Sequence, residues 1–544
     1  MPSVVLISLD TMRHDAIRAV SDMAWWEKWG LEDALRTPNL DRFAQECHVF
    51  RRCYATSSFT PPSHASMVTG RYVSAHGAKA FFHSMRSGLP TLAGILRDYG
   101  YATVAWSENE CLDYCGILRD FDETFTYRTH NWSEFAARLS SLEATFPGKV
   151  LAFIHLFDLH SPYMASLRTI GQPGEVEAYF DRLDRVLREL GHPVPQWFMR
   201  WASHLTERRP RSGAELTHYG ERVCTNGELL AEWAMGSRGD IDFRARAYTH
   251  GLSYFDRELW PVIERDLRAA GLLSEDSLTV VTADHGEAPT YIFDTRRFAH
   301  KADLVEGCLR VPLLVRYPAC RAKGLDTDQL CSLVDIVPTT LELLGLPAPA
   351  TELDGKSLLD PPDPDRAVFA EGEHFQQAKW DKWAFRQGQE EGITALWERA
   401  VVSRGLKLVQ RGDRTLLEGL ETMAPPDQVE AIYRAVIGRY PTDRESRTLL
   451  GLLEGGAANA AEIAEIAVAA VEEQGEAARL VAIDDLDETP NLLSDPQYAD
   501  EQARLDRLLD EYAARARAAE TTGAGYEAED EEAVMLRLRE LGYL

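Results

Sequence analysis

The stretch Val4-Val-Leu-Ile-Ser-Leu-Asp10 is a short apolar run that ends in a carboxylate. Such a run is typical of a fully buried parallel strand, which delivers its last side chains at the carboxyl edge of a sheet. Two further apolar runs, Val150–Leu156 and Leu278–Thr282, lead in the same way to Asp and His residues. Helical stretches separate these runs. The pattern therefore predicts an α/β fold with its functional site at the strand ends.

Two more segments extend this pattern. Val311–Arg316 is another candidate for a buried strand, and Pro318 limits its extension. The segment Thr37-Pro-Asn-Leu-Asp41 is expected to open a helix, because a proline suits the first helical turn. The alternation of strands and helices thus continues along the chain, whose length allows one large enzyme-sized domain plus one or two additions.

The chain is acidic and long enough to bury a sizeable core. It has 544 residues, of which 45% are hydrophobic, and its 58 Lys and Arg against 86 Asp and Glu give a net charge of −28. The acidic balance argues against nucleic acid or an anionic membrane surface as a partner, since both attract basic proteins. A small anionic ester bound in a local pocket is compatible with this charge.

No targeting signal is recognisable in the sequence. The apolar start is too short for a signal peptide and meets a charge at Asp10, and no apolar run approaches the ~18 residues of a membrane helix. The eight cysteines are scattered, which is typical of reduced thiols and not of a disulfide framework. We therefore expect a cytoplasmic protein that does not enter a membrane.

The stretch Ser57-Ser-Phe-Thr-Pro-Pro-Ser-His64 carries the most chemical information. It places Thr60 just before an expected helix N-terminus, where backbone N–H groups favour an anion. A threonine hydroxyl is a poor nucleophile until a base or a metal lowers its pKa. Asp10, Asp284 and His285 are metal-ligand types at strand ends. A metal that they hold beside Thr60 would activate the hydroxyl and bind a substrate oxygen.

Several motifs follow one another in a recognisable order. They are Asp10-Thr-Met-Arg-His-Asp15, Thr60-Pro-Pro-Ser-His-Ala-Ser-Met-Val-Thr-Gly-Arg71, Gly100-Tyr-Ala-Thr103, His155-Leu-Phe-Asp-Leu-His160, Val281-Thr-Ala-Asp-His-Gly-Glu287 and Lys301-Ala-Asp-Leu-Val-Glu-Gly-Cys-Leu-Arg310. With these motifs the chain resembles the alkaline phosphatase superfamily, in its sulfatase-like branch. The resemblance implies a large mixed, mostly parallel sheet flanked by helices, with a smaller C-terminal subdomain.

The chain departs from the sulfatase pattern at several positions. Thr60 stands where sulfatases have the Cys or Ser that matures to formylglycine, and so resembles the phosphodiesterase relatives. Ser107 and Asn109 replace a sulfate-binding Lys and His. Thr11 replaces the second of two paired aspartates, and His285 replaces an asparagine. This ligand set implies one divalent metal, held by Asp10, Thr60, Asp284 and His285, with Mn or Zn favoured and Ca possible.

The resemblance also implies roles for the remaining site residues. His160 matches the histidine that donates a proton to the leaving group. Lys301 matches the lysine that contacts a nonbridging oxygen, and the neighbouring His300 is the alternative residue for that inward position. His64 replaces a sulfatase arginine and would orient Thr60 or the metal ligands. The implied reaction is attack by Thr60 on phosphorus, which forms a phosphothreonine intermediate.

We expect five regions along the chain. They are a catalytic core at 1–370, a helix-rich cap candidate within it at 165–245, the start of a C-terminal subdomain at 371–424, an all-helical insertion at 425–480, and the rest of that subdomain with a terminal helix at 481–544. The region 165–245 is interpreted equally well as a pocket cap or as plain packing. The insertion resembles a small helical module of the DUF4214 type, which suggests protein docking or substrate gating.

The sequence thus predicts a metal-dependent hydrolase of a phosphodiester or a phosphonate monoester. Two alternatives stay within the enzyme class. The phosphothreonine group could be transferred to an alcohol, or the substrate could be a sulfate ester that is cleaved without formylglycine. A non-catalytic binding protein, docking partners through the helical insertion, is the alternative from another class.

Overall fold

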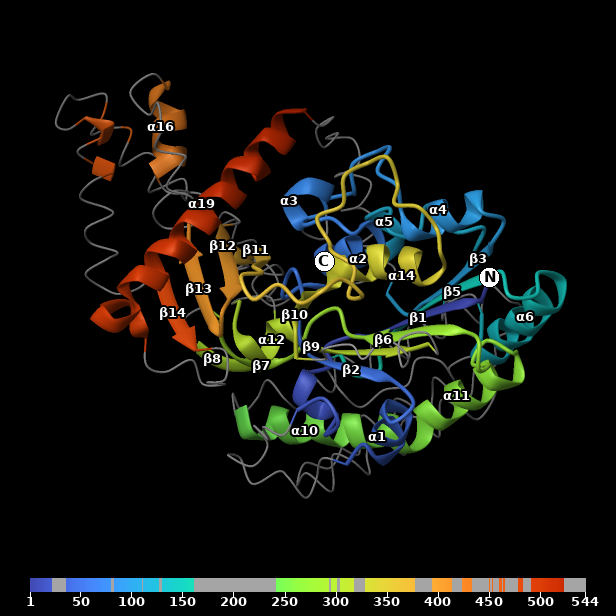
Figure 1. Cartoon of the computed structure of the whole chain (residues 1–544). Coiled ribbons are helices and arrows are strands. Elements are labelled where there is room, and N and C mark those ends of the chain that lie inside the picture. Colours follow the sequence, from blue (N-terminus) through green and yellow to red (C-terminus); the bar gives the residue numbers. More distant parts are fainter. Residues whose placement is uncertain are drawn as a thin grey trace, which may run out of the picture.

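A computed structural model of the chain describes residues 1–21, 36–79, 83–109, 111–126, 130–160, 241–292, 295–300, 304–317, 328–376, 394–412, 423–432, some positions between 450 and 464, 478–482 and 491–522. An eight-stranded sheet lies at its centre, with the strand order β10-β2-β9-β6-β1-β5-β3-β4 (Figure 1). The sheet is parallel except at β9, which runs antiparallel to both of its neighbours, β2 and β6. The expected mixed, mostly parallel sheet is therefore confirmed.

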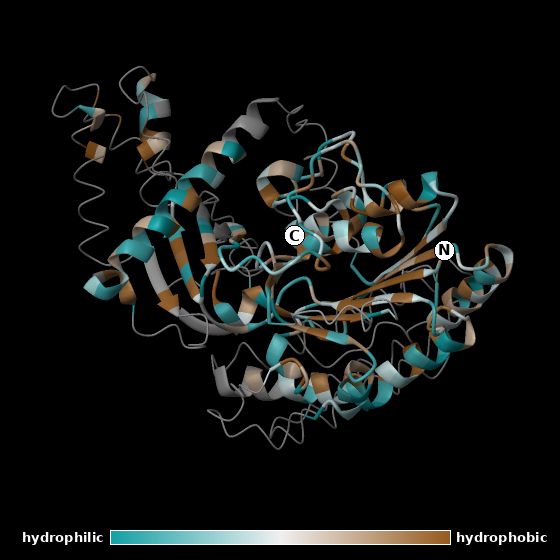
Figure 2. Cartoon of the chain, in the orientation of Figure 1, coloured by the Kyte–Doolittle hydropathy of each residue, from teal (hydrophilic) through white to brown (hydrophobic). Residues whose placement is uncertain are grey.

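The strand bounds agree with the apolar runs in the sequence. The main sheet contains β1 (Val4–Leu9), β2 (His48–Tyr54), β3 (Ala102–Ser107), β4 (Glu123–Thr126), β5 (Val150–Leu156), β6 (Leu278–Thr282), β9 (Arg310–Arg316) and β10 (Leu330–Ser332). The strands expected at β1, β5, β6 and β9 are all present. Every residue of β1, β5 and β6 is buried, because helices cover both faces of these central strands. Figure 2 shows these strands as the hydrophobic centre of the molecule.

Helices form a layer on each face of the main sheet (Figure 1). One face carries α1 (Pro38–Ala44), α10 (Ile241–Tyr254) and α11 (Trp260–Ala269), and the other carries α2 (Thr60–Thr69), α4 (Leu92–Asp98) and α14 (Ile336–Leu343). The helix expected after Thr37 is confirmed as α1, with its proline in the first turn. The remaining helices near this sheet are α3 (Val73–His76), α5 (Cys111–Tyr114), α6 (Trp132–Thr145), α12 (Glu306–Leu309), η1 (His14–Ala16), the π-helix η4 (Phe255–Leu259) and η5 (Leu333–Asp335).

A smaller antiparallel sheet follows in the C-terminal part of the chain. It contains β11 (Val368–Gln376), β12 (Thr394–Ser403), β13 (Leu406–Arg411) and β14 (Ala478–Ala482), in this order. Helix α19 (Ala499–Thr522) lies along this sheet (Figure 1). Its Tyr512 ring stacks on Phe369 of β11, with the ring centroids 4.4 Å apart. The terminal helix is expected at Ala533–Leu544, which lies outside the described residues, so α19 is a different helix that precedes it. A separate hairpin contains β7 (Ala288–Ile292) and β8 (Thr295–Ala299).

The chain leaves the small sheet after β13 and returns to it at β14. Helix α16 (Pro425–Ile432) begins this excursion, and Ala431 and Ile432 pack with Ala460 and Ala464 in a small apolar cluster. Strand β14 starts at position 478, inside the range predicted for the helical insertion. Most of that insertion, the cap candidate up to position 240 and the terminal stretch 523–544 lie outside the described residues. The described end segments are η9 (Leu492–Ser494) and η10 (Pro496–Tyr498).

Two sequence expectations concern membranes and thiols. Among the described helices, none combines the length and the apolar character that a bilayer crossing requires. The cysteines in the described ranges are free thiols, namely Cys47, Cys53, Cys111, Cys115, Cys308 and Cys331.

Candidate active site

The ends of the central strands β1 and β6 bring three of the predicted metal ligands together. Asp10 directly follows β1, and Asp284 and His285 follow β6 after one intervening alanine. The two strands are adjacent and parallel, so their carboxyl ends meet at one edge of the sheet. All three side chains are fully buried. One ligand atom from each lies within 4.8 Å of the others.

Thr60 reaches this cluster from the other side. It is the first residue of α2, one position further into the helix than the sequence suggested, and Phe59 takes the N-cap. Pro61 fits the first turn because the N–H groups there have no partner within the helix. The Thr60 Oγ1 atom lies 3.4 Å from Asp10 Oδ2 and 3.2 Å from His285 Nε2. The helix N-terminus thus presents the hydroxyl to the carboxylates and the imidazole.

The hydrogen bonds of His285 determine which of its nitrogens faces the cluster. Nδ1 lies 2.9 Å from the Gly286 carbonyl oxygen, which only accepts, so Nδ1 carries the proton. The unprotonated Nε2 then faces Thr60 Oγ1 and lies 3.4 Å from Asp284 Oδ2. A neutral imidazole with a lone pair toward two carboxylates is a suitable metal ligand.

Asp284 uses its two oxygens differently. Oδ1 accepts hydrogen bonds from the backbone N–H of Thr11, at 3.2 Å, and of His285, at 2.9 Å. Oδ2 accepts no hydrogen bond from the described residues. Burial opposes charge on this carboxyl, but the nearby His285, His64 and His155 hold its pKa down at about 2. A buried carboxylate oxygen beside a second carboxylate, an imidazole and a hydroxyl makes a donor set that fits a divalent metal.

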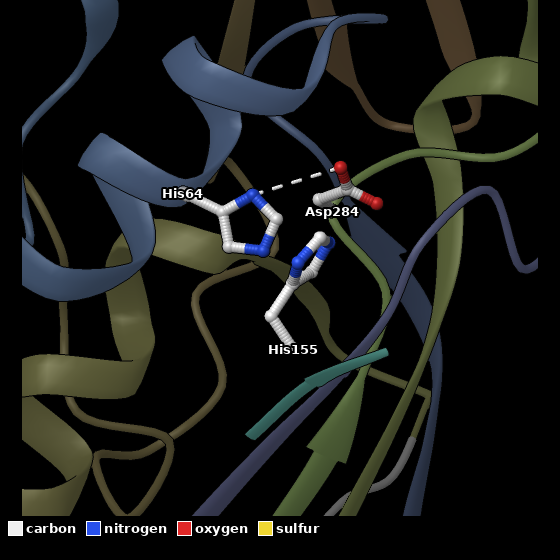
Figure 3. A group of neighbouring side chains, drawn as sticks. All are labelled: His64, His155 and Asp284. Carbon is white, nitrogen blue, oxygen red and sulfur yellow. Dashed lines mark ion pairs between the residues drawn. The ribbon is translucent and has the colours of Figure 1, made fainter. Parts of the chain in front are cut away.

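His64 and His155 form a second layer of the site, and Figure 3 shows both rings beside Asp284. His64 donates from Nδ1 to the Thr60 carbonyl at 2.9 Å and accepts at Nε2 from Ser8 Oγ at 2.8 Å, so both of its nitrogens are used. His155 Nε2 donates to Asp10 Oδ2 at 3.0 Å. Burial lowers the pKa of His64 to about 3 and of His155 to about 4, which leaves both rings neutral near pH 7.

This second layer was only partly predicted. The contact of His64 with the Thr60 backbone agrees with the expectation that it orients the nucleophile. His155 was missed as a site residue, although its motif was recognised. The available signal was its position in a predicted buried strand, because β1 and β5 pair Ser8 with His155 at the level of the site. A fully buried histidine at such a strand end is a candidate for a polar contact.

His160 and His300 lie beside the cluster. The His300 ring centroid is 4.5 Å from that of His285 and 4.9 Å from that of His160. His160 stacks on Phe157 at 4.0 Å. His300 donates from Nδ1 to the carboxylate of Glu287, at 3.0 Å to Oε1, and sequence reasoning gave Glu287 no role. Lys301, the other predicted residue here, lies outside the described residues.

Three departures from the sulfatase pattern have visible consequences. Thr11 adopts a left-handed backbone, with φ of 59°, and its hydroxyl donates to the Leu159 carbonyl at 2.7 Å. This engages the side chain with the loop after β5, where sulfatases would offer a second aspartate. Ser107 donates to the Asn109 carbonyl at 2.8 Å, and Asn109 Oδ1 accepts from the Cys111 N–H at 3.0 Å. These two side chains therefore hydrogen-bond to the backbone of the loop after β3.

Comparisons with known proteins agree with this geometry. The chain is 22% identical to the N-acetylglucosamine-6-O-sulfatase of Bacteroides thetaiotaomicron over 399 residues, which are 64% of this chain and 69% of that protein. It is 23% identical to the human N-acetylgalactosamine-6-sulfatase over 385 residues, or 66% of this chain and 65% of that protein. The chain thus spans about two thirds of the length of these relatives.

Solved structures show the same fold at low sequence identity. A 2-O GAG sulfatase has a TM-score of 0.53 and 14% identity, with 97% of this chain and 96% of the other covered. The phosphonate monoester hydrolase of Agrobacterium radiobacter has a TM-score of 0.51 and 17% identity, with 95% and 96% covered. The family model named Sulfatase matches residues 2–346, which hold every metal-ligand candidate. The chain therefore belongs to the sulfatase family of hydrolases, with an alkaline phosphatase-like fold.

Proposed function

We propose that this sulfatase-family hydrolase cleaves a small phosphodiester or phosphonate monoester, with Thr60 as its nucleophile. The observation that carries the proposal is the position of Thr60 Oγ1, 3.4 Å from Asp10 Oδ2 and 3.2 Å from His285 Nε2, at the N-terminus of α2. A hydroxyl at this point can reach a phosphorus atom whose oxygens face the helix N–H groups.

The identity of the nucleophile separates the proposal from ordinary sulfatase chemistry. Formylglycine forms when the CH₂–SH of Cys or the CH₂–OH of Ser is oxidised to an aldehyde. The Cβ of Thr60 carries a methyl group as well as its hydroxyl, so the same oxidation cannot give an aldehyde. The hydroxyl itself is therefore the group available for attack.

A divalent metal bound by Asp10, Thr60, Asp284 and His285 would supply Lewis-acid chemistry to the hydroxyl and to a substrate oxygen. Two carboxylates and one imidazole favour Mn or Zn, with Ca possible. We propose one such ion. His64 occupies both of its nitrogens with protein partners, which disfavours a second ion at His64, His155 and Asp284.

The protein residues divide the work of the reaction. Thr60 passes its hydroxyl proton to Asp10 Oδ2, the carboxylate oxygen to which it donates. Its Oγ1 atom forms a bond to phosphorus as the bond to the leaving oxygen breaks, and that oxygen takes a proton from His160. Water then attacks the phosphothreonine and passes a proton to His160, and as the phosphoryl or phosphonyl product leaves, Thr60 Oγ1 takes its proton back from Asp10. His64 holds the Thr60 backbone, and His300, fixed by Glu287, lines the same side as His160.

A sulfate ester is the second candidate substrate, because the curated relatives are named as sulfatases. A phosphoryl transferase is the third, in which an alcohol replaces water as the acceptor. Analysis of the products with an added alcohol separates hydrolysis from transfer. A binding protein without catalysis would show none of these products.

The test combines metal analysis with two matched esters. The purified protein is expected to hold about one equivalent of Mn or Zn and to hydrolyse bis-p-nitrophenyl phosphate faster than p-nitrophenyl sulfate. Thr60→Ala should lower turnover at least ~10³-fold, because a covalent nucleophile is lost, whereas Thr60→Ser keeps a hydroxyl and should retain much more.

Thr69→Ala is the matched control on the same helix. Thr69 lies nine residues after Thr60, is also buried, and donates from its hydroxyl to the Ala65 carbonyl. Loss of this hydroxyl should leave turnover nearly unchanged. Full diester turnover by Thr60→Ala would contradict the nucleophile. Preference for the sulfate ester would contradict the substrate class.

A further inference from the structure

Arg13 lies three positions after Asp10 and is almost fully buried, with 1% of its surface exposed. Its guanidinium group contacts two segments at once. Nε and Nη2 donate to the Asp15 carboxylate at 2.8 and 2.9 Å, and Nη1 donates to the Glu287 backbone carbonyl at 2.7 Å. Glu287 closes the loop that carries Asp284 and His285. One side chain thus joins the loop after β1 to the loop after β6.

Two glycines, Gly286 and Gly307, pack so closely around this contact that neither position has room for a side chain. A Cβ atom at Gly307 would lie 2.2 Å from Arg13 Nη1, and a Cβ atom at Gly286 would lie 2.1 Å from the Gly307 carbonyl oxygen. The Gly286 N–H donates to the Cys308 carbonyl at 2.7 Å. Both glycines are therefore required by close approach, since any side chain would push the loop after β6 away from Arg13.

Tyr248 of α10 holds the loop after β1 through two further hydrogen bonds. Its hydroxyl donates to the Thr11 carbonyl at 2.6 Å and accepts from the Arg13 N–H at 3.1 Å. The Thr11 N–H in turn donates to Asp284 Oδ1. The backbone from Asp10 to Arg13 is thus held on one side by α10 and on the other by the loop after β6.

We propose that Arg13 is a positioning residue of the metal site, which sets the separation of Asp10 from Asp284 and His285 and, through Glu287, the direction of His300. This inference rests on the proposed metal-dependent function. The guanidinium group of Arg13 donates to Asp15 and to the Glu287 backbone, so Arg13 is assigned a positioning role and not a catalytic one. Its effect passes through the Glu287 backbone, and the Glu287 carboxylate passes it on to His300 Nδ1.

A lysine cannot replace Arg13 in this position. The planar guanidinium group makes a two-pronged contact with Asp15 and still directs a third N–H at Glu287, whereas an ammonium group is a single point of charge. Arg13→Lys therefore keeps the positive charge next to Asp15 and loses the link between the two loops. The variant separates the geometry of the contact from its charge.

The test compares Arg13→Lys with Arg366→Lys, using Mn²⁺ binding measured by calorimetry on the metal-free full chain. Arg366 is also buried and forms an ion pair with Asp335, which follows the edge strand β10. Both variants should lose stability. Only Arg13→Lys should weaken Mn²⁺ binding, by about 10–100-fold, as is typical when a partner of metal ligands is removed. Its kcat should fall more than its KM changes.

A second readout does not depend on metal. Histidine ¹³Cε1 signals of the metal-free protein, assigned by His→Gln variants, should shift for His285 and His300 in Arg13→Lys and stay in place in Arg366→Lys. Unchanged Mn²⁺ affinity together with unchanged histidine signals would overturn the inference. A wild-type chain that binds no metal would contradict the proposed function alone, and the histidine signals would still decide the role of Arg13. If Arg13→Lys does not fold, Asp15→Asn replaces it in the test, because it weakens the two-pronged contact between the Arg13 guanidinium and residue 15. The same Mn²⁺ binding and histidine signals are then measured.

Discussion

Two buried polar clusters in this molecule are built in opposite ways. The site cluster consists of Asp10, Thr60, Asp284 and His285. The junction cluster joins the main sheet to the small sheet and consists of Tyr54, Glu306, Arg310 and Lys407. In the junction cluster, Lys407 Nζ lies 3.3 Å from Glu306 Oε2, and the Tyr54 hydroxyl donates to Glu306 Oε1 at 2.6 Å. Arg310 approaches the same carboxylate at 3.9 Å.

The difference lies in which charges each cluster contains. The junction cluster meets its buried carboxylate with fixed cations, so its own side chains balance it. Asp284 Oδ2 instead lies beside histidines, 3.4 Å from His285 Nε2 and 3.6 Å from His64 Nδ1. Because burial lowers the pKa of His64 and keeps it neutral, it cannot balance the carboxylate. The junction cluster stabilises the fold, whereas the site cluster has the donor set of a candidate metal site.

The largest expected effect comes from Asp284→Asn. The change removes one carboxylate ligand and should lower kcat/KM about 10³-fold or more, since a Lewis acid supplies several kcal/mol of transition-state stabilisation. It should also abolish stoichiometric uptake of Mn or Zn, measured by elemental analysis after dialysis. Asp335→Asn is the control, because Asp335 is equally buried but pairs with Arg366. If Asp284→Asn retained its metal, the proposed role of Asp284 as a metal ligand would be contradicted.

Lys407→Met should produce the reverse result. It leaves the buried Glu306 carboxylate without its lysine, which typically costs about 3–5 kcal/mol in the free energy of unfolding. Urea denaturation monitored by fluorescence measures this loss. The folded fraction should bind Mn²⁺ and turn over substrate like the wild type. Adding Glu306→Gln to Lys407→Met should recover part of the stability, and a double variant as unstable as the single one would contradict the pairing.

The sequence was sufficient for the parts of the site that depend on strand ends. Asp10, Asp284 and His285 directly follow apolar runs, and parallel strands bring such ends to one edge of a sheet. Thr60 was predictable because two prolines mark a helix start. These features are local. Apolar strand runs and prolines at a helix start are visible in short stretches of sequence, so these residues can be located without knowledge of distant contacts.

The supporting contacts could not be predicted in the same way. Glu287 accepts from His300 because the β7–β8 hairpin brings its two ends together, and Arg13 donates to the Glu287 carbonyl because β1 and β6 are neighbours in the sheet. In sequence a buried arginine resembles a surface residue, and the Glu287 carbonyl that Arg13 contacts is 274 positions away. The same holds for Tyr512 of α19, whose partner Glu371 is 141 residues distant. Long-range polar pairing carries no periodic signal.

The smallest expected effect concerns the contact between Tyr512 and Glu371. Glu371 is a second buried carboxylate that protein groups partner, in contrast to the carboxylates of the site cluster. The Tyr512 hydroxyl donates to Glu371 Oε1, which also accepts from the Ser74 N–H at 3.0 Å. Tyr512→Phe should cost about 1 kcal/mol near pH 8, because the Ser74 N–H continues to partner the carboxylate. Activity should stay at the wild-type level, since the contact lies between α19, β11 and α3.

The pH dependence provides a more specific check. Burial and the neighbouring Glu371 charge raise the pKa of Tyr512 well above its ordinary value. A raised folded-state pKa means that the contribution of Tyr512 to stability is complete below the unfolded pKa of about 10 and is lost as pH rises beyond it. The stability difference between wild type and Tyr512→Phe should therefore shrink between about pH 10 and pH 11.5, in urea titrations at each pH. A difference that stays constant across this range would mean that the Tyr512 hydroxyl ionises in the folded protein as readily as in the unfolded chain, and would contradict its pairing with Glu371.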